Sequence, residues 1–398
     1  MDGVWDLVVV GGGPAGAAAA LRARQLRPHA RVLLLDRQAF PRDKACGDGI
    51  AAHGLDELDL LGVGGLLADY RPVRRLTVVS PGGRCVHATV ARPNLVVPRR
   101  VFDARLVEAA RARGVEVRRH RVRALADTGG RVVLDGPAGP DGVTGVTGGR
   151  GDGIVARAVV AADGANSTVR RLIGVPATAD RHTALAVRGY TDVPAGDDTQ
   201  LIVMRREGWP AYAWSFPVGD GSANVGFGML LPRLRAAGAP VRRVLHDGLA
   251  DLLPGLPARD LRAHRLPLSC GRPVPGAGRV LLAGDAASLV NPLTGEGIYY
   301  ALLSGRLAAE AALQAPGDPL PAYRRALRRV LGRHLRTTDA LAVAARFPGF
   351  IDAAISTAAR RREVFDVLVE VGLGSGTVPA PLLCAVAGRW LAGVLPGR

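Results

Sequence analysis

Three glycines and one aspartate near the N-terminus have the spacing of a dinucleotide-binding site. Gly11, Gly13 and Gly16 follow the apolar run "DLVVV" (residues 6–10), and Asp36 follows Gly16 by twenty residues. In this pattern the first glycine permits a tight turn, the second lets the backbone approach a pyrophosphate, and the third lets a helix pack closely on a sheet. N–H groups at the helix start would bind the phosphates, and Asp36 would bind an unphosphorylated ribose. The pattern predicts a bound dinucleotide without distinguishing FAD from NAD.

Two later segments also place an aspartate beside glycine at the end of an apolar strand. "VVAADGANSTVRR" (159–171) contains Asp163, and "RVLLAGDAASLVNPLTGEGI" (279–298) contains Asp285. A carboxylate at a strand end can accept hydrogen bonds from ligand hydroxyls. The glycine-flanked turn at 294–297 is typical of a helix start, where N–H groups would stabilise negative charge. An ordinary helix cap is the alternative interpretation of Asp285.

Aromatic side chains and one cysteine are further candidates. In "YAWSFP", Tyr212, Trp214 and Phe216 alternate, so on a strand they share one face. We interpret this face as a wall of an apolar substrate pocket, with ordinary sheet core as the alternative. Cys46 precedes Gly-Asp-Gly, which indicates tight backbone near a ligand, although an inert buried thiol is as consistent with the pattern.

The elements that must position these residues follow from the apolar patterns. The strand-like runs at 6–10 and 31–36 flank an alanine-rich helix, which predicts a βαβ unit with a parallel sheet. Between residues 181 and 270, strand-like runs follow one another with few helical signals, which predicts an inserted antiparallel sheet. After Asn291 the chain is expected to be mostly helical.

Composition excludes several classes of function. The 398 residues carry a formal charge of +17, but the arginines are scattered, and we expect no nucleic-acid partner. Four isolated cysteines and eight histidines without ligand spacing predict no metal. No secretion signal and no long uninterrupted apolar run is recognisable, and Arg389 interrupts the apolar C-terminal segment. We therefore expect a cytoplasmic protein whose membrane contact is at most peripheral.

Six motifs in order carry a resemblance to a known family. They are the glycine fingerprint, "FPRDKACGDGI", "PRRVFD", "ADGANSTVR", "YAWSFP" and "AGDAASLVNPLTGEGI", which span residues 4 to about 310. The chain resembles FAD-dependent oxidoreductases of the para-hydroxybenzoate-hydroxylase fold, in particular the geranylgeranyl reductase family and natural-product flavin monooxygenases. The resemblance implies an α/β fold: a Rossmann-like FAD-binding domain (GR2/PHBH type), an inserted antiparallel β-sheet substrate domain and a helical C-terminal region.

The resemblance also implies domain limits and site residues. The FAD-binding domain would comprise 1–72, 99–180 and 271–330, the substrate domain 73–98 and 181–270, and the helical region 331–398. Asp285 would contact the ribityl chain, Gly295 to Gly297 the pyrimidine ring, and Arg99 the phosphate or ribityl region. The residues predicted to bind FAD are Gly11, Gly13, Pro14, Ala15, Gly16, Asp36, Arg37, Lys44, Cys46, Gly47, Arg99, Asp163, Gly164, Gly284, Asp285, Pro292, Gly295, Gly297 and Ile298. The predicted catalytic or substrate-contacting residues are Cys46, Tyr212, Trp214 and Phe216.

Two chemistries fit this prediction. A monooxygenase, with NAD(P)H as transient reductant, would pass oxygen from a flavin C4a-hydroperoxide to a large apolar natural product such as a prenylated indole or polycycle. A geranylgeranyl-reductase-type enzyme would pass hydride to isoprenoid C=C bonds. Residues 50–53, Ile-Ala-Ala-His, depart from the Thr-Pro-Arg usual in the actinobacterial reductases, which favours the monooxygenase. A flavin-binding protein without enzymatic activity is the third possibility.

Overall fold

A six-stranded sheet organises the half of the molecule that contains the N-terminal motif. The computed structural model describes residues 3–135, 153–194, 196–271, 273–315 and 317–394. The strand order is β17-β18-β11-β2-β3-β7, and all neighbours are parallel except β17 and β18. The strands are β2 (Leu7–Val10), β3 (Val32–Asp36), β7 (Glu116–Arg119), β11 (Val159–Ala161), β17 (Gly276–Ala277) and β18 (Val280–Leu282).

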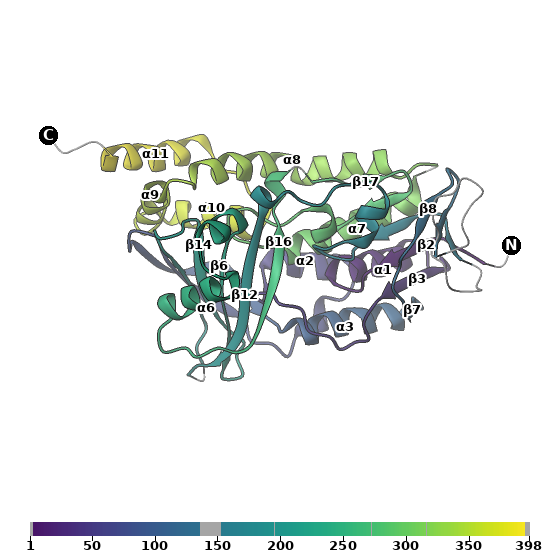
Figure 1. The fold of residues 1–398 in the computed structure, drawn as a ribbon, viewed down its shortest axis with the longest axis horizontal. Coiled ribbons are helices and arrows are strands. Elements are labelled where there is room, and N and C mark those ends of the chain that lie inside the picture. The colour runs from purple at the N-terminus through teal and green to yellow at the C-terminus, as the bar shows by residue number, and fades with distance from the viewer. Residues whose placement is uncertain (1–2, 136–152, 195, 272, 316, 395–398) are drawn as a thin grey trace.

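The predicted βαβ unit is present. Strands β2 and β3 are buried along their whole length, which explains why both sequences are continuously apolar. Helix α1 (Pro14–Leu26) connects them and packs on α7 (Ile298–Gln314) and α3 (Arg99–Ala112) (Figure 1). The contact between α1 and α7 is close, because a Cβ on Gly305 would lie 2.0 Å from the carbonyl oxygen of Ala15. Small residues therefore bring the two helices that flank the predicted site together.

An eight-stranded sheet forms the other half of the molecule, with order β16-β12-β15-β14-β13-β5-β6-β4. Its strands are β4 (Gly49–Ile50), β5 (Val73–Val79), β6 (Cys85–Val96), β12 (Thr183–Asp192), β13 (Thr199–Met204), β14 (Ala211–Pro217), β15 (Ser222–Leu230) and β16 (Arg259–Pro267). The sheet predicted to be antiparallel is mixed, because β13 and β5 pair in parallel. These two strands come from separate segments of the chain, so no hairpin turn fixes their relative direction.

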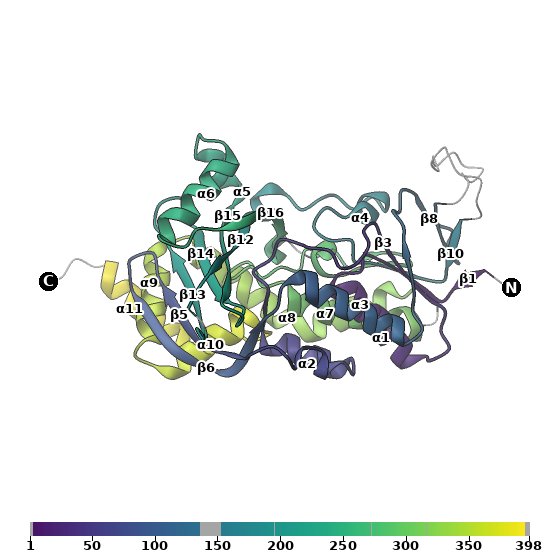
Figure 2. The same cartoon turned by 90° about the horizontal axis from the view of Figure 1, so that it is seen from below.

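Helices cover both faces of this second sheet. Helices α5 (Leu231–Ala236) and α6 (Val241–Leu252) lie on one face, where Ala213, Val225 and Phe227 are fully buried. On the opposite side lie α8 (Leu320–Ala344), α9 (Pro348–Ala358), α10 (Arg362–Leu373) and α11 (Ala380–Val394) (Figure 2). The C-terminal region is helical, as predicted. Residue 331 lies within α8, so the limit predicted there falls inside a helix.

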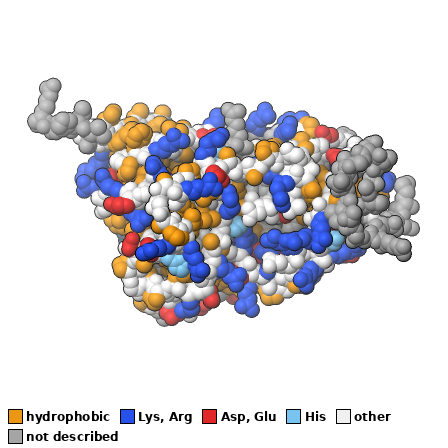
Figure 3. All heavy atoms as spheres, viewed as in Figure 1, with side chains coloured by type: hydrophobic (Ala, Val, Ile, Leu, Met, Phe, Trp, Pro, Cys, Tyr) orange, Lys and Arg blue, Asp and Glu red, His pale blue; other side chains and the backbone are white. Residues whose placement is uncertain are grey.

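The remaining described elements are peripheral. Strands β1 (Val4–Trp5), β10 (Ile154–Ala156), β9 (Val132–Leu134) and β8 (Leu125–Asp127) form a small sheet in that order, and α2 (Ala52–Leu60) and α4 (Thr168–Leu172) are short helices. On the face shown in Figure 3, arginine side chains are scattered, and apolar side chains gather toward α11. Among the described residues, no single helix is long and apolar enough to cross a membrane; α8 and α9 would meet that test only jointly, across a bend of 117°.

Candidate active site

The three glycines of the fingerprint have different structural reasons to be glycine. Gly11 has φ +103°, and a Cβ there would lie 2.3 Å from the carbonyl oxygen of Ala162. A Cβ on Gly16 would lie 1.8 Å from the carbonyl oxygen of Gly11. Gly13, the residue before α1, has an ordinary φ of −77°, and its Cβ would approach no atom closer than 3.7 Å. Packing explains Gly11 and Gly16, whereas Gly13 borders an open space.

Two arginines face the space above Gly13. The nearest atoms to its Cβ position are Nη2 of Arg42 and Nη2 of Arg99, each at 3.7 Å. N–H groups at the start of α1 and two guanidinium groups therefore surround a space into which a larger residue would intrude. This donor set fits the pyrophosphate of FAD. Arg42 was not among the predicted residues, although it lies in the motif "FPRDKACGDGI".

Asp36 is held in place at the end of β3. Its carboxylate accepts hydrogen bonds from the N–H of Gly12 at 2.8 Å and of Gln38 at 2.9 Å, and Arg42 lies 3.4 Å away. The side chain is thus positioned beside the glycine turn, where it could accept from a ribose hydroxyl. The neighbouring Arg37, also predicted to bind FAD, is exposed at the surface.

Arg99 is fixed by its own helix. It is 3% exposed and makes a bidentate ion pair with Asp103, at 2.7 and 2.8 Å, one turn further along α3. Arg42 donates to the same carboxylate at 3.1 Å. One buried aspartate therefore orients both guanidinium groups near Gly13. Removing either partner of this buried pair would leave an uncompensated charge, which is strongly destabilising.

Asp163 has a structural role at the start of α4. Its carboxylate accepts hydrogen bonds from the Ser167 hydroxyl and from the backbone N–H groups of Thr168 and Val169, at 2.5 to 3.1 Å. These bonds fix the start of α4 rather than pointing the carboxylate at a ligand. Gly164 follows with φ +81° and completes the turn. Contact of this motif with FAD stays a prediction.

Asp285 and the only lysine of the chain form a pair that joins distant segments. Nζ of Lys44 lies 2.9 Å from Oδ2 of Asp285, and Nε2 of His264 lies 3.5 Å from it. Burial opposes ionisation of Asp285, but Lys44 and His264 hold its pKa below the usual range. Asp285 is therefore a carboxylate that can accept hydrogen bonds from hydroxyl groups. It follows Gly284, whose φ of +58° lets the turn pass close to α1 and α7.

The loop before α7 places a helix start beside Asp285. It contains Pro292 and Gly295, and Gly297 is the residue immediately before Ile298, the first of α7. A Cβ on Gly297 would lie 3.7 Å from Oδ1 of Asp285. The N–H groups of Gly297, Ile298 and Tyr299 at this helix start act on the Glu296 carboxylate of the same loop, so contact of the loop with the pyrimidine side of a flavin stays a prediction.

A buried polar network holds the turn that contains Cys46. Asp48 is fully buried with φ +59°, and it accepts hydrogen bonds from the hydroxyl of Tyr190 (2.5 Å) and the side-chain amide of Asn224 (2.7 Å). The same amide donates to the carbonyl of Cys46, and its oxygen accepts from Nε1 of Trp214 at 2.8 Å. Burial raises the pKa of Asp48 to about 6 and also raises that of the Cys46 thiol. Sequence reasoning missed Asp48 and Asn224, although the Gly-Asp-Gly pattern marked this turn as tight.

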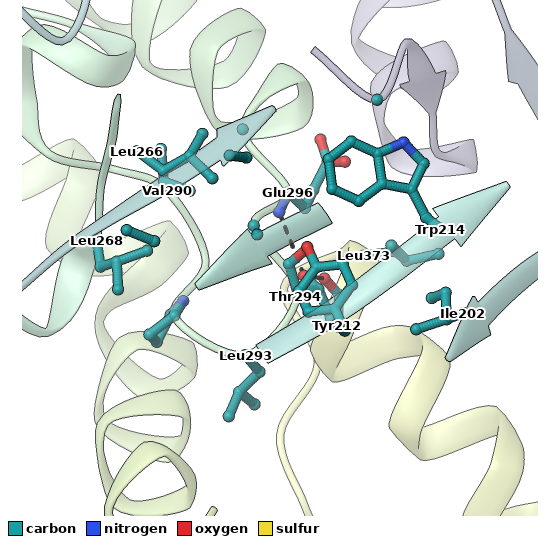
Figure 4. Close-up of a pocket in the computed structure, with 18 of the residues that line it drawn as sticks. Ile202, Tyr212, Trp214, Leu266, Leu268, Val290, Leu293, Thr294, Glu296 and Leu373 are labelled. Atoms are coloured by element: carbon teal, nitrogen blue, oxygen red, sulfur yellow. Dashed lines mark hydrogen bonds between the residues drawn. The ribbon is translucent and has the colours of Figure 1, made fainter. Parts of the chain in front are cut away.

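A cavity of about 620 Å³ lies between the second sheet, the loop before α7 and the C-terminal helices. Tyr212, Trp214 and Phe216 line one wall, and Gly47 packs against the last two at 3.4 to 3.5 Å from its Cβ position. Figure 4 shows Tyr212 and Trp214 on β14, with Thr294 and Glu296 of the loop at the same cavity. The Tyr212 hydroxyl donates to the carbonyl of Thr294 at 2.5 Å.

Cross-strand pairing explains the shape of this wall. Trp214 lies opposite Gly226 on one side and Ile202 on the other, and partners across strands point to the same face. A Cβ on Gly226 would lie 2.1 Å from the Trp214 ring, so the indole lies directly over this glycine. The cavity continues past Ile202 to apolar residues of the C-terminal helices, among them Phe350 and Phe365.

The structure thus brings most of the predicted residues to one connected region. Lys44, Cys46, Gly47, Arg99, Asp285 and the loop 292–298 line the cavity together with the aromatic wall, and Pro14 of α1 borders it as well. Among the described residues, no group of three or more His, Cys, Asp or Glu side chains is arranged to hold a metal ion.

Comparison with known proteins agrees with this arrangement. Residues 5–209 match the family model described as FAD binding domain. The chain is 34% identical to menaquinone reductase from Mycolicibacterium smegmatis, over 92% of this chain and 90% of that protein. It is 35% identical to digeranylgeranylglycerophospholipid reductase 2 from Methanopyrus kandleri, over 78% of this chain and 77% of that protein.

A solved structure shares the fold. The geranylgeranyl bacteriochlorophyll reductase-like protein from Thermoplasma acidophilum superimposes with a TM-score of 0.76 and 20% identity, over 98% of this chain and 97% of that one. The space bordered by the glycine turn and the two arginines, with Asp285 nearby, fits the groups of FAD that the sequence predicts there. The chain is an FAD-dependent oxidoreductase and belongs to the geranylgeranyl reductase family of FAD-binding proteins.

Proposed function

We propose that the protein is a reductase that adds hydrogen across C=C bonds in the isoprenoid chain of a large apolar substrate, such as a prenylated quinone or lipid. The observation that carries this proposal is the apolar part of the cavity of about 620 Å³, which lies beyond the residues assigned to FAD and runs along Trp214 and Ile202 to the C-terminal helices. The names of the two similar reductases support it, since menaquinone and digeranylgeranyl lipids are molecules of this class.

The cavity reaches the protein surface beside Val343, where a chain longer than the cavity could extend outward. Val343, near the end of α8, lines the cavity and is 55% exposed, and Phe347, between α8 and α9, is exposed to the same extent. A long apolar chain could place one double bond beside the aromatic wall while the rest extends through this opening. Apolar walls favour such a ligand because they remove its surface from water.

Different residues of the site would bind FAD and position the substrate. Arg42, Arg99 and the start of α1 would hold the FAD phosphates, and Asp285 the ribityl chain. Bound FAD, reduced by a nicotinamide nucleotide, would supply the hydride. The loop 292–298 would border the pyrimidine ring, and Trp214 would exclude water from the reacting bond.

One experiment separates the two chemistries. The FAD-loaded protein is reduced anaerobically with dithionite and mixed with geranylgeranyl diphosphate or a fully unsaturated menaquinone. A reductase is reoxidised without oxygen. Mass spectrometry then finds a product whose isoprenoid chain has gained a pair of hydrogens, and for menaquinone this gain must remain after the quinol ring has been reoxidised in air. Reoxidation that requires oxygen, with a product that has gained an oxygen atom, would replace this proposal with the monooxygenase that residues 50–53 favour. NAD(P)H as reductant and a cytoplasmic location stay predictions.

A matched pair of variants tests the role of the cavity. Ile202 lies at the centre of the sheet face, between Trp214 and Val78 on the adjacent strands. Ile202→Trp should fill the passage to the C-terminal helices, so that only isoprenoids with short chains are reduced. Ile202→Val keeps the passage open and should retain the substrate range of the unmodified protein. Equal chain-length preference in both variants would show that the chain takes another route.

A further inference from the structure

Adding hydrogen across an isolated C=C bond needs a proton as well as a hydride, so the site must contain an acid. At the end of the cavity bordered by Asp285 and the start of α7, several side chains carry exchangeable protons. They are Lys44, Cys46, Asp48, Tyr212, His264, Asp285 and Glu296. Their contacts decide which of them holds a transferable proton near neutral pH.

Most of these groups are unsuited to the role. Lys44 and Asp285 are paired at 2.9 Å, and the low pKa of Asp285 keeps it ionised. Burial raises the pKa of Cys46 and of Tyr212, so both are weak acids, and the Tyr212 hydroxyl already donates to the Thr294 carbonyl. Burial and Lys44 lower the pKa of His264, which leaves it neutral.

Glu296 combines a fixed position with access to the cavity. Its Oε1 accepts the backbone N–H of Tyr299 at 2.8 Å, within the first turn of α7. The side chain also lines the cavity, on the loop that receives the Tyr212 hydroxyl bond (Figure 4). The carboxyl group is therefore anchored by the helix and still reaches the space proposed for the substrate.

We propose that Glu296 is the acid that donates the proton to the alkene, an inference that rests on the proposed reductase function. One alkene carbon forms a C–H bond with the hydride that reduced FAD supplies. The other carbon forms a C–H bond with the proton of Glu296, whose O–H bond breaks. The alkene gains two electrons and the flavin loses two. Glu296 is left as a carboxylate and takes up a proton from water before the next turnover.

The electrostatic surroundings of Glu296 agree with this role. Burial raises its pKa to about 7, although N–H groups at the start of α7 act in the opposite direction. Tyr212 from β14 and Tyr300 from α7 face it as neutral groups, because burial raises the pKa of both. On the far side of Tyr299, His53 of α2 pairs with Glu370 of α10 at 3.1 Å.

Asp48 is the other carboxyl group at the Asp285 end of the cavity whose pKa is raised toward neutrality. Its contacts make it unsuited to donate a proton to the alkene. The hydroxyl of Tyr190 and the amide of Asn224 both donate to its Oδ2, and the N–H of Arg99 lies 3.3 Å from its Oδ1. It is 0% exposed and serves to hold the turn at Cys46. Glu296 remains the acid that can release a proton into the cavity.

The test compares Glu296→Gln with Glu370→Gln, a nearby partly exposed glutamate whose partner is His53. The amide oxygen of E296Q can still accept the Tyr299 N–H, so FAD content and dithionite reduction should match the unmodified protein. Anaerobic reoxidation by geranylgeranyl diphosphate should slow by about 10²–10⁴-fold in E296Q and remain normal in E370Q. In the unmodified protein this rate should fall above about pH 7, whereas the residual rate of E296Q should not.

A spectroscopic readout does not depend on turnover. Infrared difference spectra should show a protonated carboxyl band that disappears as the pH rises through about 7, present in E370Q and missing in E296Q. Normal reoxidation of E296Q, or a Glu296 that is already ionised at pH 5, would overturn the assignment while leaving the reductase function intact. If the unmodified protein reduces neither geranylgeranyl diphosphate nor menaquinone, the proposed function fails, and the assignment with it.

Discussion

Replacing Gly13 by alanine separates cofactor binding from folding more cleanly than any other single change in the site. The added methyl group would contact Nη2 of Arg42 and of Arg99 at 3.7 Å, an ordinary van der Waals distance, and the φ of −77° suits alanine. Alanine stabilises a helix less than glycine does at the position before the helix start. It also lowers the conformational entropy of the unfolded chain, which stabilises the folded protein. These effects oppose each other, so we expect the free energy of unfolding of the FAD-free protein to change by less than about 1 kcal/mol.

FAD binding should respond much more strongly to the same change. The methyl group occupies the space where a phosphate oxygen would meet the N–H groups of α1 and the two guanidinium groups. A hydrogen bond to a charged group contributes about 1.5–3 kcal/mol. Losing one such bond should weaken FAD binding by about 10- to 150-fold. The assay is titration of the FAD-free protein with FAD, followed by quenching of flavin fluorescence, together with unfolding in urea.

Gly16→Ala is the matched control. Its Cβ would lie 1.8 Å from the carbonyl oxygen of Gly11, so the turn or the helix must move, and the protein should lose about 1–3 kcal/mol of stability or more. If Gly13→Ala binds FAD as tightly as the unmodified protein, the space above Gly13 does not hold the pyrophosphate. If Gly16→Ala is fully stable, the packing argument is wrong.

Three further predictions follow from the contacts of single side chains. Arg42→Ala should weaken FAD binding at least tenfold in the same titration, whereas Arg37→Ala, at an exposed position, should not, and equal effects would contradict the assignment. Trp214→Phe should lower stability in urea by about 1–3 kcal/mol, because the oxygen of Asn224 loses its donor, and should raise KM for the isoprenoid; unchanged stability would show that the bond is dispensable. The raised pKa of Glu296 means that the folded protein binds more protons than the unfolded chain between pH 4.5 and about 7, so stability should fall across this interval as the pH rises. Glu296→Gln should remove this loss of stability, so the stability of the variant relative to the unmodified protein should grow with pH, to at most about 3 kcal/mol. Parallel pH profiles of the two proteins in urea unfolding would refute the raised pKa of Glu296.

The sequence determined the dinucleotide-binding unit because every rule that specifies it acts over a short distance. Continuous apolar runs require strands that are buried on both faces, and glycines at fixed spacing require a tight turn between strand and helix. The structure has β2, the turn at Gly11 to Gly13, α1 and β3 in the predicted places. Asp36 is likewise at the end of its strand, where hydrogen bonds from Gly12 and Gln38 hold it.

The aromatic wall could be predicted only in part. Alternation along β14 places Tyr212, Trp214 and Phe216 on one face, whatever surrounds the strand. Which face lines a cavity depends on other segments, since α6 covers the opposite side and Gly226 provides room for the indole. Alternation along a strand predicts which side chains share a face. What packs against each face is decided by segments far away in the chain.

Tertiary structure alone decided the charged contacts of the site. Lys44 pairs with Asp285 across 241 residues, and Asp103 orients Arg42 and Arg99 together. The guanidinium group of an arginine lies several ångströms from the backbone, so its location cannot be read from its position in the sequence. Arg42 therefore reaches the space above Gly13, whereas Arg37, five residues earlier, lies at the surface. The raised pKa of Glu296 depends in the same way on its burial in the folded chain. Local spacing determined where the backbone can bind FAD, and the packing of distant segments decided which charged groups meet there.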